Sequence, residues 1–256
     1  MRIAVLQMEA CCGDVEANLA RISAAAAEAA GRSADLLIAP ELATIGYGAG
    51  EAIRSLAEPA DGTQVARLAA IASEAGLAVI AGFAERAGGV IHNSAVLVSG
   101  GTAPAVYRKS HLYGDYERAL FTPGDPSTAI STVRELKVGM LICYDVEFPE
   151  NARCLALAGA ALVAVPTALP AGPHASMIAE RVIPVRAFEN QIFVAYANHC
   201  GGDALFAYAG LSHIAAPDGS TLAIAGATGE DLVIADVRPD DFARSRAENT
   251  YLRDLR

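Results

Sequence analysis

The sequence predicts a single α/β domain, and three observations support this prediction. Short aliphatic segments alternate with segments of helical periodicity almost from end to end. The chain has 256 residues, of which 53% are hydrophobic, enough to bury one large core. Two β-α-β stretches, one beginning at Met1 and one near Val133, indicate a loose two-fold plan. We therefore expect one domain over residues 1–240 and a polar C-terminal tail over 241–256, a docking segment or dimer arm.

The first half of the chain supplies two helices between short strands. Asp14 is expected to cap a helix that runs to about Ala30, because its side chain can accept a hydrogen bond from the first turn. A second helix is expected over 61–75, where apolar residues recur at helical spacing and Gly76 follows as a stop. Apolar runs predict strands over 3–8, 36–38, 77–83 and 91–98.

The second half continues the alternation. Pro149 suits the opening turn of a helix whose body covers 151–160, and a helix over 175–190 should kink or split at Pro184. Pro217-Asp218-Gly219 predicts a tight turn between two short strands. The expected strands cover 138–142, 161–165, 192–198, 212–216, 221–225 and 232–237.

Charge and cysteine usage exclude several classes of protein. The 19 basic and 29 acidic residues give a net charge of -10, which argues against binding to nucleic acid or an anionic membrane. No apolar stretch is long enough to span a bilayer. Five cysteines without CxxC spacing argue against a disulfide framework or a zinc site and favour a reducing compartment, so we expect a cytoplasmic protein without a metal. Cys154 and Cys200 are expected in the core.

Cys143 is the most informative residue. It follows the apolar run 138–142 directly, and the next helix begins near Pro149. A thiol at a strand exit, just before a helix, occupies the place where α/β folds position nucleophiles and ligands. A cysteine with a purely structural role would more often lie inside the apolar run.

A cysteine nucleophile needs a base and a group that stabilises the oxyanion, and two other residues could supply them. Glu41 follows the strand 36–38 and Pro40, where partial burial would raise its pKa towards that of a useful base. A helix cap or a salt-bridge partner is the alternative role for Glu41. Lys109 would be a fixed cation if it pointed inward, although a lysine in such a place is usually solvated.

Three motifs occur in a fixed order along the chain. They are Pro40-Glu41, Tyr107-Arg108-Lys109-x-His111-Leu112 and Cys143-Tyr144-Asp145-x-x-Phe148-Pro149-Glu150. Supporting matches are Asn93-Ser94, Phe121-Thr122-Pro123-Gly124 and Arg186-Ala187-Phe188-Glu189-Asn190-Gln191. In combination, these motifs resemble those of the nitrilase superfamily, the carbon–nitrogen hydrolases, over nearly the whole chain.

The resemblance implies a four-layer α-β-β-α sandwich in which Glu, Lys and Cys meet at the strand ends. Carried over residue by residue, Glu41 would be the general base, Lys109 would hold the tetrahedral intermediate, and Cys143 would be the nucleophile. Amidases of the family use a second glutamate eight residues after the lysine, which here is Glu117. The backbone N–H of Tyr144 would complete the oxyanion hole.

The resemblance also bears on the substrate. Relatives that hydrolyse N-carbamoyl amino acids carry arginines just after the Cys-x-Asp, whereas this chain has Val146 and Glu147. If Glu147 faces the pocket it would favour an amine-bearing substrate, and a surface glutamate at a helix entry is an equally open interpretation. Thr167 and Ala168 fall where the family places pocket residues, and Tyr47 is expected to line the pocket.

The expected function is a cysteine-dependent amidase that converts small linear amides, including amino-acid amides, to acid and ammonia through a thioester. This chemistry needs no metal or organic cofactor. A nitrilase and an N-carbamoyl amine hydrolase use the same triad and remain open. A catalytically silent binding scaffold and a redox-active thiol protein are alternatives of other classes. The resemblance further implies a homodimer or a higher homo-oligomer, with the dimer formed through the helices over 149–159 and 175–190.

Overall fold

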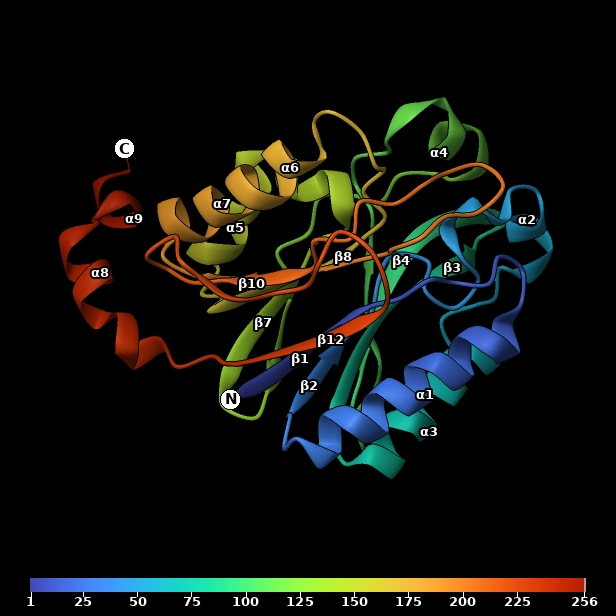
Figure 1. Ribbon diagram of the computed structural model, residues 1–256, viewed down its shortest axis with the longest axis horizontal. Coiled ribbons are helices and arrows are strands. Elements are labelled where there is room, and N and C mark those ends of the chain that lie inside the picture. Colours follow the sequence, from blue (N-terminus) through green and yellow to red (C-terminus); the bar gives the residue numbers. More distant parts are fainter. Residues whose placement is uncertain (256) are drawn as a thin grey trace.

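The computed structural model describes residues 1–255 and contains two six-stranded sheets packed face to face (Figure 1). The first sheet comprises, in order, β12 (Asp231–Asp236), β1 (Arg2–Gln7), β2 (Leu36–Ile38), β3 (Ala78–Ala87), β4 (Val90–Val98) and β5 (Ala105–Arg108). The second comprises β11 (Thr221–Ile224), β10 (His213–Ala215), β9 (Phe193–Asn198), β8 (Leu162–Thr167), β7 (Leu136–Met140) and β6 (Ile130–Val133).

Each sheet has three parallel strands flanked by antiparallel ones. In the first sheet β1, β2 and β3 run parallel, and in the second sheet β7, β8 and β9 do. The two expected β-α-β stretches, β1-α1-β2 and β7-α5-β8, therefore occupy corresponding places. Parallel neighbours bring their carboxyl ends to one edge, so residues that leave these strands can meet there.

Helices cover the outer face of each sheet (Figure 1). The long helices α1 (Val15–Gly31) and α3 (Thr63–Ala75) pack on the first sheet, and α5 (Pro149–Leu157) and α7 (Ile183–Asn190) pack on the second. The inner faces of the sheets share one apolar core. The architecture is the expected four-layer α-β-β-α sandwich. The shorter helices are α2 (Ala52–Leu56), α4 (Gly114–Leu120), α6 (Ala175–Met177), α8 (Ala243–Glu248) and α9 (Tyr251–Asp254).

Local sequence signals end several elements where expected. The Asp14 carboxylate accepts a hydrogen bond from the Ala17 N–H at 2.9 Å and caps α1. Gly76 ends α3 in the left-handed conformation, with φ of 69°. The helix expected over 175–190 is split, because Pro184 has no N–H to donate and one π-helical turn over Ile178–Val182 precedes α7.

Two sequence predictions need correction. The strand expected over 138–142 ends at Met140, because the Ile142 N–H donates to the Asp145 carboxylate at 3.1 Å as the chain turns away from the sheet. Cys154 is exposed rather than in the core, since α5 buries its neighbour Leu155 and leaves Cys154 on the solvent side. Cys200 is buried as expected. The sequence patterns also did not predict α4, β5 or β6.

The described part of the tail packs on α7 of the same chain (Figure 1). The Ser245 hydroxyl donates to the Gln191 side chain at 2.9 Å, and the Tyr251 ring lies 5.7 Å from that of Phe188. Arg256, the last residue of the predicted tail, lies outside the described residues. Within residues 1–255, no helix is both long and apolar enough to cross a membrane.

Candidate active site

Glu41 lies just beyond β2 and is fully buried. Its Oε1 accepts hydrogen bonds from the Asn93 side-chain amide at 2.6 Å and from the Lys109 ammonium at 2.7 Å. Its Oε2 has no hydrogen-bond partner among the described residues. A buried carboxylate oxygen without a donor is costly in free energy, and it is the oxygen available to take up a proton.

The backbone of Glu41 is held as firmly as its side chain. Its carbonyl oxygen lies 2.7 Å from Nε2 of buried His199, which directly follows β9 in the second sheet. Gly82 packs so closely that a Cβ there would lie 2.2 Å from the Leu42 nitrogen. His199 was not predicted as a site residue; its position at a strand exit was the available signal.

Lys109 directly follows β5, and its ammonium lies between two carboxylates. Nζ donates to Glu41 at 2.7 Å and to Glu117 at 2.6 Å, and the side chain is completely buried. Burial lowers the pKa of Lys109, but the two carboxylates raise it by more, so the net pKa lies well above its usual value. Lys109 is therefore a fixed positive charge in the interior.

The same set of charges gives Glu41 an unusual pKa. Burial is the largest influence and raises the pKa of Glu41, and the negative charge of Glu117 raises it further. Lys109 and the Asn93 amide act in the opposite direction, and the resulting pKa is about 7. A carboxyl group with this pKa can both accept and release a proton near neutral pH.

Glu117, in α4, has donors for both of its oxygens. Oε1 accepts from Lys109 and from the Tyr47 hydroxyl at 2.9 Å, and Oε2 accepts from the Tyr113 N–H at 2.7 Å. Burial raises the pKa of Tyr47, so its phenol stays neutral and acts as a donor. The structure thus places Glu117 beside Lys109 with all its acceptors in use, in contrast to Glu41.

Cys143 begins a 3-10 turn over Cys143–Glu147 and has a φ of 46°, a strained conformation for a side chain of this size. Burial raises the pKa of its thiol well above the usual value; the charge of Glu41 adds to this and that of Lys109 opposes it. The backbone N–H of Ala168 also lowers this pKa through a hydrogen bond. The thiol therefore stays protonated until a base removes its proton.

Asp145 joins the lysine loop to the cysteine turn, a role that the sequence reasoning missed. Its buried carboxylate accepts from the Tyr107 hydroxyl at 2.9 Å, the Ser110 hydroxyl at 2.9 Å, the His111 N–H at 2.8 Å and the Ile142 N–H at 3.1 Å. A carboxylate used in this way fixes two loops relative to each other. Its place two residues after Cys143 was the signal.

The remaining predicted site residues are buried to different degrees. The Thr167 carbonyl accepts from the Glu41 N–H at 3.4 Å, and Thr167 and Ala168 are both buried at the end of β8. Tyr144 is half-buried, with its ring 5.2 Å from that of Tyr113. Glu147 is half-buried at the end of the cysteine turn.

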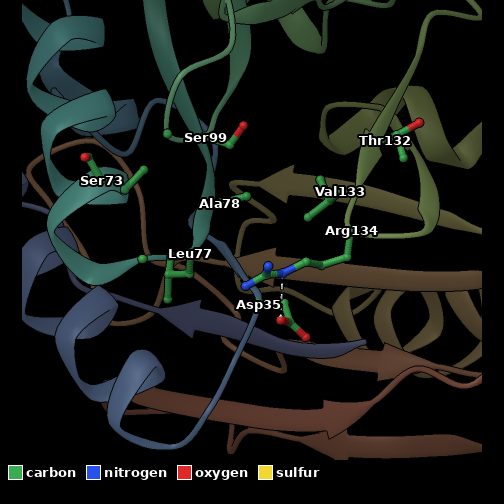
Figure 2. A pocket seen from close by; sticks show the side chains of 11 residues that line it. Asp35, Ser73, Leu77, Ala78, Ser99, Thr132, Val133 and Arg134 are labelled. Carbon is green, nitrogen blue, oxygen red and sulfur yellow. Dashed lines mark hydrogen bonds and ion pairs between the residues drawn. The ribbon is translucent and has the colours of Figure 1, made fainter.

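A separate shallow pocket of about 300 Å³ lies at the other end of β2 (Figure 2). An ion pair between Arg134 and Asp35 at 3.1 Å crosses it, and Ser73, Leu77 and Ser99 contribute to its wall. None of the predicted site residues lines it. Among residues 1–255, no group of three or more His, Cys, Asp or Glu side chains could hold a metal ion.

Comparison with known proteins identifies the family. The carbon-nitrogen hydrolase family model matches residues 2–247. The chain belongs to the carbon-nitrogen hydrolase family. It is 46% identical to a protein described as a hydrolase in the pqqF 5' region of Pseudomonas protegens, over all of this chain and 89% of that protein. It is 37% identical to an (R)-stereoselective amidase of a Pseudomonas species, over all of this chain and 92% of that protein.

Solved structures of this hydrolase family match the fold. An amidase of the nitrilase superfamily from Nesterenkonia superposes with a TM-score of 0.89 at 34% identity, covering all of this chain and 95% of that one. In a mutant of that amidase, the acetamide moiety of fluoroacetamide has added covalently at the active-site cysteine. The resemblance found in the sequence and the α-β-β-α fold are confirmed.

Proposed function

We propose that this carbon-nitrogen hydrolase is a cysteine-dependent amidase that converts small linear amides to acid and ammonia. The observation that carries the proposal is the buried Glu41 carboxylate, with one oxygen bound to Lys109 and the other without a donor. Its pKa of about 7 suits a group that must take and return a proton. The amidases among the similar proteins support the choice of substrate class.

In the proposed acylation step, Glu41 removes the proton from the Cys143 thiol, and the thiolate forms a bond to the amide carbonyl carbon. The carbonyl electrons move to oxygen, where the Lys109 ammonium and the Tyr144 N–H stabilise the oxyanion. The C–N bond then breaks while Glu41 returns its proton to the leaving nitrogen. Ammonia departs and leaves a thioester on Cys143.

In the proposed deacylation step, Glu41 takes a proton from water and the resulting hydroxide attacks the thioester carbon. The same groups stabilise the second tetrahedral intermediate. The C–S bond breaks, Glu41 returns the proton to sulfur, and the acid leaves. Glu117 and Tyr47 hold the Lys109 ammonium in place through both steps, and Thr167 and Ala168 border the acyl group.

The test is ammonia release by the purified protein from aliphatic amides, amino-acid amides, N-carbamoyl amines and nitriles. Release from amides that is lost in Cys143→Ala supports the proposal. Release from nitriles or N-carbamoyl amines alone would assign one of the related activities instead. No release from any class, together with a thiol that resists alkylation, would point to a silent scaffold. Reversible disulfide formation after mild peroxide would point to a redox thiol.

We also propose a homodimer formed through α5 and the segment from α6 to α7. Large apolar side chains are exposed there, namely those of Leu157, Met177 and Val185. The tail over 241–256 would extend this surface, since its described part packs on α7. A monomeric mass in sedimentation at micromolar concentration would overturn this proposal.

The free cysteines support a cytoplasmic location.

A further inference from the structure

Glu147 ends the short turn that Cys143 begins, and its side chain is half-buried. Within residues 1–255, no side chain or backbone donor makes a hydrogen bond or ion pair with its carboxylate. A carboxylate that has lost part of its hydration without gaining a donor is in an unfavourable environment, which a ligand that supplies a positive charge would relieve.

Arg186, the cationic side chain that contacts this turn, binds groups other than the Glu147 carboxylate. Arg186 donates from Nε to the Val146 carbonyl at 2.9 Å and from Nη2 to the Glu147 carbonyl at 2.6 Å. Its Nη1 pairs with Glu189 at 2.9 Å. The guanidinium therefore fixes the backbone of the turn and leaves the Glu147 carboxylate without a donor.

The Glu147 carboxylate lies in the electric field of the reacting groups. Half-burial raises its pKa, and the positive charges of Lys109 and Arg186 oppose this rise. Burial is the main cause of the raised pKa of Tyr196 in β9, and the charges of Cys143 and Glu147 raise it further. The Glu147 carboxylate therefore lies within electrostatic range of Lys109 and Tyr196.

An aromatic cluster adjoins the turn that Glu147 ends. In a 3-10 turn, side chains three residues apart eclipse each other, so Glu147 follows Tyr144. The Tyr144 ring lies 5.2 Å from that of Tyr113 and 4.9 Å from that of Phe148, and all three are partly open to solvent. An aromatic cluster and an unpaired carboxylate on one turn are a combination suited to binding an ammonium group.

We propose that Glu147 is a specificity-determining residue that selects amides carrying a protonated amine a few bonds from the scissile carbonyl. The ammonium would pair with the Glu147 carboxylate against the Tyr144 ring, while the amide carbonyl lies at Cys143. This inference rests on the proposed amidase function. It follows the first of the two interpretations of Glu147 that the sequence left open.

The test compares amides that differ only in an ammonium for a methyl group. The pairs are glycinamide with propanamide, β-alaninamide with butanamide, and 4-aminobutanamide with pentanamide, assayed for ammonia release at neutral pH. For at least one pair, we expect the wild-type protein to favour the amine-bearing member in kcat/KM by about tenfold or more, as for a hydrogen bond to a charged group. This comparison requires no variant.

The variant Glu147→Gln should reduce that preference to near unity while keeping the shape of the side chain. Glu150→Gln is the matched control, since it makes the same charge change on an exposed residue of α5 and should keep the wild-type preference. If Glu147→Gln fails to fold, Glu147→Asp should show a reduced preference instead.

The outcomes separate the two proposals. Hydrolysis of both members of every pair at similar kcat/KM would overturn the role of Glu147 and leave the amidase function intact. An equal loss of preference in Glu147→Gln and Glu150→Gln would also overturn it, because a general charge effect would then suffice. No ammonia from either member of any pair, nor from the other amides of the wider panel, would overturn the proposed amidase function itself.

Discussion

Two carboxylates flank the three-residue strand β2, and their surroundings differ sharply. Asp35 precedes the strand at the shallow pocket, where its side chain is 27% exposed and pairs with Arg134, which is 64% exposed. Glu41 follows the strand at the candidate active site, where both it and its partner Lys109 are completely buried. Each carboxylate pairs with one basic side chain, but only the pair of Glu41 and Lys109 is removed from water.

The difference shows what burial does to an ion pair. Water solvates both partners of an exposed pair, so the pair adds little to stability. In the interior, the desolvation of Glu41 and the nearby Glu117 charge outweigh Lys109, and the pKa of Glu41 rises to about 7. Oε2 of Glu41, which has no hydrogen-bond donor among the described residues, is the oxygen available to bind this proton.

The largest expected effect comes from neutralising each carboxylate in turn. Glu41→Gln should lower kcat/KM for amides by about 10²–10⁴-fold, because it removes a proton-transfer group while preserving shape. Asp35→Asn should leave kcat/KM within about twofold, since surface changes away from the site have small effects. Steady-state ammonia release measures both. Similar losses in the two variants would break the comparison.

The second-largest expected effect is a loss of stability when Lys109 is replaced. Lys109→Met removes the positive charge that compensates Glu41 and Glu117, and breaking a buried pair in this way typically costs about 3–5 kcal/mol in free energy of unfolding. The loss should be larger at pH 8 than at pH 5, because Glu41, whose pKa is about 7, is protonated and uncharged at the lower pH. Urea unfolding at both values measures this.

Arg134→Met is the matched control for the lysine variant, because it removes a cation from the exposed pair. We expect no measurable change in its urea midpoint at either pH. A loss in Lys109→Met that is no greater than in Arg134→Met would mean that burial of the lysine pair has no energetic consequence.

A smaller effect concerns the donor that steadies Glu117. Tyr47→Phe deletes the hydroxyl that donates to Glu117 at 2.9 Å, and we expect kcat/KM to fall by about tenfold, the value of a hydrogen bond to a charged group. Tyr251→Phe, in the exposed tail, should match the wild type. Unchanged kinetics in Tyr47→Phe would show that Lys109 needs no support through Glu117.

The smallest expected effect is a shift along the pH axis. Glu41 must be deprotonated to act as a base, so kcat/KM should fall as pH drops through about 7. The Asn93 amide lowers the pKa of Glu41, so Asn93→Leu should move this limb to higher pH. Asp35→Asn should not move it. A limb near pH 4.5 in the wild type would contradict the assignment of Glu41 as the base.

Sequence patterns predicted most of the fold because the signals were local. The Asp14 cap, the Gly76 stop and the Pro184 split each depend on the chemistry of one residue and its immediate neighbours. Strand β5 has no such signal, since it has only four residues and ends in the exposed Arg108. Cys154 was misplaced because apolar residues on a helix do not all face the sheet.

The residues of the candidate site also fall into two groups, those that the sequence predicted and those that it did not. Glu41, Lys109 and Cys143 were predicted from strand exits and from the order of motifs, and Glu117 was predicted from the resemblance to amidases of the family. His199 and Asp145 were missed because their work is to hold backbone atoms far away in sequence. The orphaned Oε2 of Glu41 follows from three-dimensional packing, which no local pattern encodes.

We propose that the buried charges of Glu41 and Lys109 make Cys143 the reactive thiol, in preference to the exposed Cys12 and Cys154. The most direct measurement is peptide mapping after inactivation by fluoroacetamide, in which the thiolate displaces fluoride. We predict that label appears on Cys143 in step with the loss of activity and that a substrate amide protects it. Label on Cys154 or Cys12 at the inactivating dose, with Cys143 unmodified, would contradict the account.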